Sequence, residues 1–278
     1  MKYAFNTFVF SGYPRWLPCY DRAYAIEVVA QAGYDGIEIG CTAPIAWPYY
    51  LDDAQIEATG QELRARGLAV STLVPPPGGG PGLNPASPDP RERAATLDLF
   101  RRMVPLARSW GARQFIYVPG WIVGHTRQSV AWSHATELLA TLAEELEPEG
   151  IGLAIEPTSA NSNLVDTVDQ AVLMAETVGR ANVGVMFDTF HAIFRHESPA
   201  DYVDRAQGRL VHVQLADVER RAPGPGPVDY HALLRRLRAV RYDGYLAMEI
   251  GLTDRSVSVE GIAREALAYM RRVEVESA

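Results

Sequence analysis

The sequence predicts an α/β fold, a single (β/α)8 barrel domain spanning residues 1–278. Three observations lead to this prediction. Short apolar runs alternate with amphipathic stretches, and this unit recurs eight times at intervals of about 30 to 35 residues. No composition break or linker divides the chain. No G-x-G-x-x-G follows the first apolar run, which argues against the alternative, a doubly wound open sheet.

The expected strands are mostly continuous apolar runs, as parallel strands that are buried on both faces require. They are Tyr3–Phe10, Gly36–Gly40, Ala69–Pro75, Gln114–Pro119, Gly152–Glu156, Val183–Asp188, Leu210–Leu215 and Tyr245–Ile250.

The expected helices show apolar residues at helical spacing, and several are followed by a glycine where the helix should stop. In the third, Leu97, Phe100, Val104 and Ala107 recur with arginines between them. The Pro- and Gly-rich segment Pro75–Pro90 is expected to be a long loop on the active-site face. The helices are Tyr24–Ala32, Asp53–Arg66, Arg91–Trp110, Val130–Glu147, Val168–Val178, Pro199–Arg205, Tyr230–Val240 and Val259–Arg272.

Composition excludes several classes of protein. A formal charge of −8 gives no electrostatic basis for binding nucleic acid or an anionic membrane. Lys2 is the one lysine, at a poor place for a buried Schiff-base nucleophile. Two cysteines, Cys19 and Cys41, cannot form a disulfide framework or a cysteine-based zinc site. With no targeting segment and no apolar run near the length of a membrane span, we expect a soluble, cytoplasmic protein.

Ionisable residues occur at the ends of four consecutive expected strands, the fifth to the eighth. Each of these residues follows or interrupts an apolar run; they are Glu156, Asp188, His212 and Glu249. Active sites of (β/α)8 barrels lie at the carboxyl ends of the strands, so these side chains should converge. Three carboxylates in one barrel mouth repel one another unless a cation joins them.

We therefore expect Glu156, Asp188, His212 and Glu249 to bind a divalent metal ion. An oxygen-rich set with one nitrogen suits Mn²⁺ best, and Mg²⁺, Co²⁺ or Zn²⁺ are also compatible. The alternative is that each residue ends a strand in a cap or pairs with one of the many arginines.

Other residues near the strand ends are candidates for substrate binding. His191, three residues after Asp188, could contact a substrate oxygen, or it could be a surface or supporting histidine. Glu38 could line the barrel mouth or pair with an arginine. Trp121 could stack on a sugar or cover the rim, and Arg220 could bind a polar substrate group or lie in solvent. The candidate substrate-binding residues are therefore Glu38, Trp121, His191 and Arg220.

Asp229 and His231 have the spacing of a metal-ligand pair, but the pattern favours a helix start. Asp229 stands where the N-cap of the seventh helix is expected, which places His231 in the first turn of that helix.

At these residues the sequence resembles the xylose-isomerase-like TIM barrels, specifically the sugar isomerase/epimerase family that includes D-tagatose 3-epimerase. The resemblance covers nearly the whole chain. Its most specific parts are Ile155-Glu156-Pro157, Phe187 to His191, Val211-His212-Val213, and the tail from Pro223 to Glu249.

The resemblance implies that Glu156, Asp188, His212 and Glu249 bind a divalent metal, often Mn²⁺. It implies that Glu156 and Glu249 are the catalytic acid/base pair on opposite faces of the substrate, and that His191 contacts substrate. Two departures weaken a specific ketose assignment: Ser162 stands where ketose 3-epimerases carry a second glutamate, and Val218 stands where they tend to have an arginine.

The function expected from these residues is a metal-dependent isomerase or epimerase of a ketose or keto-polyol. The metal polarises the carbonyl, one glutamate removes the neighbouring C–H proton, and a metal-stabilised enediolate is reprotonated. Loss of a β-leaving group from the same intermediate would instead make the enzyme a lyase, like inosose dehydratases or enzymes that cleave oxidised C-glycosides.

Two other classes of function compete with this interpretation. A DNA-repair enzyme like endonuclease IV would need more histidines, whereas the third and fourth strands end in Val74 and Tyr117. A barrel that binds sugar without turnover is disfavoured by four clustered ligand-type residues. We expect a small sugar-like partner, no nucleic acid and no membrane; a homo-oligomer and a partner subunit are both compatible with the sequence.

Overall fold

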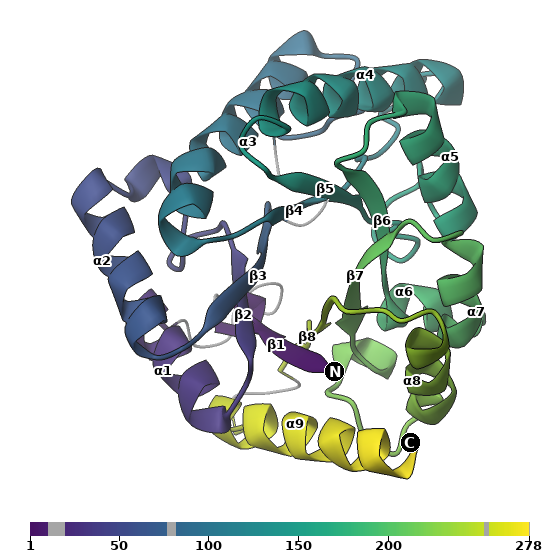
Figure 1. Cartoon of the computed structure of the whole chain (residues 1–278). Helices are drawn as coiled ribbons and strands as arrows, with labels where there is room; N and C mark the ends of the chain where they lie inside the picture. The colour runs from purple at the N-terminus through teal and green to yellow at the C-terminus, as the bar shows by residue number, and fades with distance from the viewer. Residues whose placement is uncertain (11–19, 77–81, 253–255, 278) are drawn as a thin grey trace.

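Eight parallel strands close into a barrel in the order of the chain, with β8 hydrogen-bonded to β1 (Figure 1). The structure is a computed structural model that describes residues 1–10, 20–76, 82–252 and 256–277. The closed barrel confirms the predicted fold class. The strands are β1 Lys2–Asn6, β2 Gly36–Gly40, β3 Ala69–Val74, β4 Gln114–Tyr117, β5 Gly152–Ile155, β6 Val183–Asp188, β7 Leu210–Leu215 and β8 Tyr245–Met248.

Helices form a ring around the strands, and α9 closes it beside the start of the chain (Figure 1). The α-helices are α1 Arg22–Ala32, α2 Asp53–Ala65, α3 Pro90–Trp110, α4 Gln128–Leu146, α5 Val168–Val178, α6 Thr189–Phe194, α7 Pro199–Arg205, α8 Tyr230–Ala239 and α9 Val259–Glu276. Short 3₁₀ segments are η1 Thr7–Phe10, η2 Pro48–Tyr50 and η4 Val218–Arg220. Within the described part of the chain, none of the helices is both long and apolar enough to cross a membrane.

Alternate residues along the strands belong to two apolar clusters. Phe115 and Tyr117 of β4 belong to the large core shared with the helices, whereas Ile116 between them belongs to a smaller cluster. Because successive side chains of a strand point to opposite faces, the smaller cluster fills the barrel interior. It consists of Phe8, Val74, Ile116, Val118, Ala154 and Met186.

The first expected strand, Tyr3–Phe10, is shorter than predicted. β1 ends at Asn6, because the Asn6 side-chain oxygen accepts a hydrogen bond of 2.7 Å from the Phe8 backbone N–H and turns the chain into η1. Phe8 and Val9 therefore stand on a turn at the carboxyl end of the barrel instead of in a strand.

The sequence also gave no indication of α6. Asp188, the last residue of β6, accepts a hydrogen bond of 2.9 Å from the Phe190 backbone N–H and caps this helix. Helix α6 turns His191 toward the strand ends.

Asp229 and His231 have the roles predicted from the helix-start pattern. The Asp229 side chain accepts a hydrogen bond of 2.8 Å from the Ala232 backbone N–H at the N-terminus of α8. His231 Nδ1 lies 2.9 Å from the hydroxyl of Ser277. Cys41 is buried, and Cys19 lies outside the described residues.

Candidate active site

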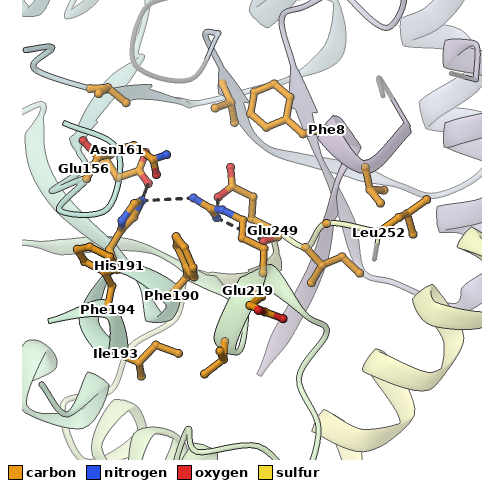
Figure 2. Close-up of a pocket in the computed structure, with 18 of the residues that line it drawn as sticks. Phe8, Glu156, Asn161, Phe190, His191, Ile193, Phe194, Glu219, Glu249 and Leu252 are labelled. Atoms are coloured by element: carbon orange, nitrogen blue, oxygen red, sulfur yellow. Dashed lines mark hydrogen bonds and ion pairs between the residues drawn. The ribbon is translucent and has the colours of Figure 1, made fainter. Parts of the chain in front are cut away.

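A cavity of about 940 Å³ opens at the carboxyl ends of the strands. The segments after β5 to β8 each bring at least one charged or titratable side chain to its lining, and Figure 2 shows Glu156, His191 and Glu249 around its centre. Asp188 and His212 do not line it; their side chains are buried next to it, with exposures of 0% and 2%. The four strand ends singled out in the sequence thus converge on one region.

Glu156 and Glu249 point inward because each continues the hydrogen-bond ladder one residue beyond its strand. The Glu156 backbone N–H donates to Tyr117 O at 3.0 Å, and that of Glu249 donates to Leu215 O at 3.1 Å. The adjacent strand therefore fixes each backbone, so each side chain faces the barrel axis.

Arg220 occupies the centre of the site. Its Nη1 contacts Asp188 Oδ2 at 2.5 Å and also contacts Glu249 Oε2, while its guanidinium stacks on the Phe190 ring at 4.5 Å. Its carbonyl accepts a hydrogen bond of 2.7 Å from the Gly251 N–H. Arg220 is thus held in the cavity and is not a solvated surface arginine.

The backbone that carries Arg220 has an unusual conformation. Glu219 and Arg220 have φ values of 57° and 60°, in the left-handed region that side-chain-bearing residues rarely adopt. Such strain persists only where surrounding contacts hold it, and it concentrates at functional sites. The two ion pairs of Arg220 supply those contacts.

The site carries more negative than positive charge. Asp188, Glu156 and Glu249 surround one guanidinium, so full ionisation would give three negative charges against one positive. Burial, together with the charge of Asp188, raises the pKa of Glu156 to about 8 although Arg220 opposes the shift. Burial also raises the pKa of Glu249, against the effect of Arg220. A cation would relieve this repulsion, so the donor set fits a divalent ion.

His191 is held in one tautomer. Its Nδ1 accepts a hydrogen bond of 3.1 Å from the Ala160 backbone N–H, so the proton of the neutral ring is on Nε2. Nε2 lies 3.8 Å from Glu156 Oε1 and 3.3 Å from Arg220 Nη2. Burial lowers the pKa of His191 to about 4, Arg220 contributes to the shift and Asp188 opposes it. His191 therefore presents a neutral N–H donor to the cavity.

Glu38 does not line the cavity, so the expectation that it contacts substrate is not supported. It is fully buried, and its Oε2 lies 2.6 Å from His212 Nε2. Burial raises the pKa of Glu38, but the charge and proximity of His212 and the hydrogen bonds from Thr72 and Gln214 outweigh burial and lower it. Its remaining donors are Thr72 Oγ1 at 2.5 Å, Asn6 Nδ2 at 2.6 Å and Gln214 Nε2 at 2.8 Å.

The surroundings of the Glu38 carboxylate determine which nitrogen of His212 carries the proton. Donor atoms of Thr72, Asn6 and Gln214 keep the Glu38 carboxylate ionised. The contact of this carboxylate with His212 Nε2 holds the ring proton on that nitrogen. The Nδ1 atom of His212 is then the nitrogen with a lone pair. A histidine whose N–H contacts a carboxylate is the usual arrangement of a metal-binding imidazole.

Trp121 does not line the cavity among the described residues. Its backbone is anchored by Asn84, whose side chain accepts from the Trp121 N–H at 3.1 Å and donates to the Trp121 carbonyl at 2.9 Å. Thr158 and Asn161, which were not predicted as site residues, also line the cavity. The signal that could have identified them is their position, since both are polar and stand two and five residues after Glu156 at the end of β5.

Glu156, Asp188 and His191 form the compact group of possible metal ligands. Within the described residues, their ligand atoms all lie within 4.8 Å of one another. This group differs from the predicted set. Arg220 lies between Asp188 and Glu249, and His212 Nε2 faces Glu38.

Comparison with known proteins gives one family. D-psicose 3-epimerase of Ruminiclostridium cellulolyticum is 28% identical over 240 residues, 82% of this chain and 78% of its own length. Inosose isomerase of Bacillus velezensis is 25% identical over 240 residues, 81% of each chain. A crystal structure of D-psicose 3-epimerase with D-fructose present superposes with a TM-score of 0.84 at 23% identity, covering 99% of both chains.

A family model described as xylose isomerase-like TIM barrel matches residues 26–273. This match agrees with the closed barrel and with the resemblance seen in the sequence. The chain therefore belongs to the xylose isomerase-like TIM barrel family.

Proposed function

We propose that this chain is a divalent-metal-dependent isomerase or epimerase of a ketose or keto-polyol. The relatives named D-psicose 3-epimerase and inosose isomerase support this class of reaction. The observation that carries the proposal is the pair of buried carboxyls from β5 and β8, Glu156 and Glu249. Both side chains face one cavity, from strand ends that lie apart around the barrel. A carboxylate can accept a proton and, once protonated, can return it.

The metal would be held by Glu156, Asp188, Glu249 and the Nδ1 atom of His212. Three carboxylates with one imidazole suit Mn²⁺ best, with Mg²⁺, Co²⁺ or Zn²⁺ as alternatives. When bound, a divalent ion supplies Lewis-acid polarisation of the substrate carbonyl and so makes the neighbouring C–H more acidic.

His191 is proposed as a hydrogen-bond donor to substrate and not as a metal ligand. The Ala160 N–H occupies Nδ1, which leaves Nε2 protonated and without a lone pair for a metal. A neutral N–H that faces the cavity suits a substrate carbonyl or hydroxyl oxygen. Arg220, which lies 3.3 Å from this Nε2, adds positive charge where negative charge would develop on substrate oxygen.

Glu156 and Glu249 then divide the proton transfers between them. One carboxylate removes the proton from the carbon beside the carbonyl, and the other carboxyl returns a proton. Return to the same carbon from the opposite face gives an epimer, and return to the adjacent carbon gives an isomer. Loss of a β-leaving group after the first step would give a lyase.

The test is deuterium incorporation in D₂O by Mn²⁺-loaded protein, with ketoses, keto-inositols and 3-keto-glycosides as substrates. We expect a new C–D bond beside the carbonyl, located by NMR, that disappears with EDTA and returns with added Mn²⁺. An eliminated fragment would identify a lyase. Stoichiometric Mn²⁺ binding without exchange on any substrate would contradict the proposal and favour a binding protein.

A further inference from the structure

The short turn after β7 that carries Arg220 is hydrogen-bonded to Asp217. This residue stands at the start of η4, three positions before Arg220. Its side-chain Oδ1 accepts a hydrogen bond of 2.7 Å from the Val218 N–H, and its carbonyl accepts one of 3.1 Å from the Arg220 N–H. Its own N–H donates to the Arg221 carbonyl at 2.8 Å. Asp217 is therefore bonded to Arg220 and to residues on both sides of it in the chain.

The Asp217 carboxylate is enclosed by the Pro- and Gly-rich segment that follows the turn. The residue is buried, with 4% exposure. Gly226 lies against it so closely that an added Cβ would overlap the carboxylate oxygen Oδ2. Within the described part of the chain, this Oδ2 has no hydrogen-bond partner. A buried carboxyl with an unused oxygen costs stability, so packing alone does not account for an aspartate at this position.

The base of the turn is fixed from a neighbouring strand end. Thr189 Oγ1 donates to the Ala216 carbonyl at 2.6 Å and accepts from the Ala216 N–H at 2.9 Å. Thr189 follows Asp188, the last residue of β6, and Ala216 directly precedes Asp217. The turn therefore starts from a point that is anchored beside Asp188, one of the two carboxylates with which Arg220 pairs.

The conformation of the turn determines where the Arg220 side chain points. Glu219 and Arg220 have φ values of 57° and 60°, a left-handed conformation that side-chain-bearing residues leave unless contacts hold it. A change to the right-handed or extended region would rotate the Cα–Cβ bond of Arg220 and carry its guanidinium away from Asp188 and Glu249. The ion pairs act at the end of the side chain, whereas the hydrogen bonds of Asp217 act on the backbone itself.

We propose that Asp217 is a positioning residue for Arg220: its carboxylate, closed in by Gly226, keeps the left-handed turn that holds the guanidinium between Asp188 and Glu249. Asp217 does not line the cavity, so it acts through Arg220. This inference rests on the proposed function for the task of Arg220, which is to place positive charge near a substrate oxygen. The alternative is that Asp217 contributes only to the stability of the fold.

Four variants separate positioning from general stability. Asp217→Ala removes the Oδ1 acceptor, and Gly226→Ala displaces the carboxylate while leaving Asp217 in the chain. Asp217→Asn keeps the size of the side chain and an acceptor for the Val218 N–H, so it should restore what Asp217→Ala loses. Asp229→Ala is the matched control, because Asp229 caps α8 through the same kind of hydrogen bond and is not part of the turn.

The first measurement follows the Arg220 guanidinium by NMR and needs no substrate. An aromatic ring shifts the resonances of groups above its face, and this guanidinium stacks on Phe190 at 4.5 Å, so Phe190→Leu identifies the shift. We expect Asp217→Ala and Gly226→Ala to lose most of the shift, and Asp217→Asn and Asp229→Ala to keep it. A wild-type shift in folded Asp217→Ala or folded Gly226→Ala would overturn the proposal.

The second measurement is deuterium exchange on D-psicose, the sugar in the name of one relative, with protein saturated with Mn²⁺. Asp217→Ala should slow exchange by about tenfold to 100-fold, since misplacing an active-site group by about 1 Å can cost 10²-fold. In Arg220→Met protein the same change should cost less than about twofold, because the group that Asp217 positions is gone. Asp217→Asn should recover most of the rate. An equal loss with and without Arg220 would show a general structural role and overturn the proposal.

The two measurements distinguish failure of this inference from failure of the proposed function. If the guanidinium shift changes as expected but the wild-type protein exchanges no deuterium, the role of Asp217 is supported and the proposed chemistry on this sugar is contradicted. If the wild-type protein exchanges deuterium and Asp217→Ala leaves the guanidinium shift unchanged, the chemistry is supported and the positioning role is contradicted.

Discussion

Replacing Glu249 by Gln is expected to slow deuterium exchange beside the substrate carbonyl by about 10²–10⁴-fold, the usual contribution of a general acid or base. The amide keeps the size of the side chain but cannot accept or return the proton. Glu156→Gln should have an effect of similar size, because epimerisation needs a group on each face. Exchange is measured by mass spectrometry with the Mn²⁺-loaded variants.

Two controls keep this result interpretable. Mn²⁺ affinity is measured for both variants, since each glutamate is also a proposed ligand, and exchange is compared at saturating metal. Glu219→Gln removes a carboxylate from the cavity rim, where the side chain is 58% exposed, and should change exchange little. Full activity of Glu249→Gln at saturating metal would contradict the two-carboxylate mechanism. An effect in only one of the two variants would indicate a single base.

Replacing Glu38 by Ala is expected to lower the free energy of unfolding by about 3–5 kcal/mol, the usual effect of removing one partner of a buried charge pair. The change leaves the donors on His212, Thr72, Asn6 and Gln214 without their shared acceptor. Urea denaturation in EDTA measures the effect without a contribution from bound metal.

The matched control is Glu62→Ala, which removes an exposed pair with Arg66 and should cost at most about 1 kcal/mol. Glu38→Gln keeps two acceptor lone pairs and should fold. Because it loses the ionised partner of His212, it should bind Mn²⁺ about 10–100-fold more weakly. If Glu38→Ala has wild-type stability and Glu38→Gln has wild-type Mn²⁺ affinity, Glu38 neither stabilises the fold nor orients His212 for the metal.

The contribution of Glu38 to stability should depend on pH. Its pKa is lowered in the folded chain, so the contribution is complete above the unfolded value of about 4.3 and is lost as the pH falls through the lowered folded value. Glu38→Gln should therefore flatten the acid limb of the stability profile.

The sequence by itself determined the barrel and the strand ends that carry chemistry. Mostly apolar runs such as Val183–Asp188 and Leu210–Leu215 predict parallel strands buried on both faces, and the structure reproduces the bounds of both to the residue. Ionisable residues at the carboxyl ends of such runs are expected at or beside the barrel mouth. Local hydrogen bonding likewise made Asp229 recognisable as a helix cap.

Only the tertiary structure decided which side chains meet. Glu38 and His212 are far apart in the sequence, and their contact follows from the register of a closed barrel and not from any local pattern. Arg220 reaches Asp188 and Glu249 because η4 adopts a strained backbone that no local preference predicts. The tautomer of His191 depends on one backbone N–H, that of Ala160. Propensity and periodicity act over a few residues, whereas burial, charge pairing and proton position are set by neighbours that folding brings together.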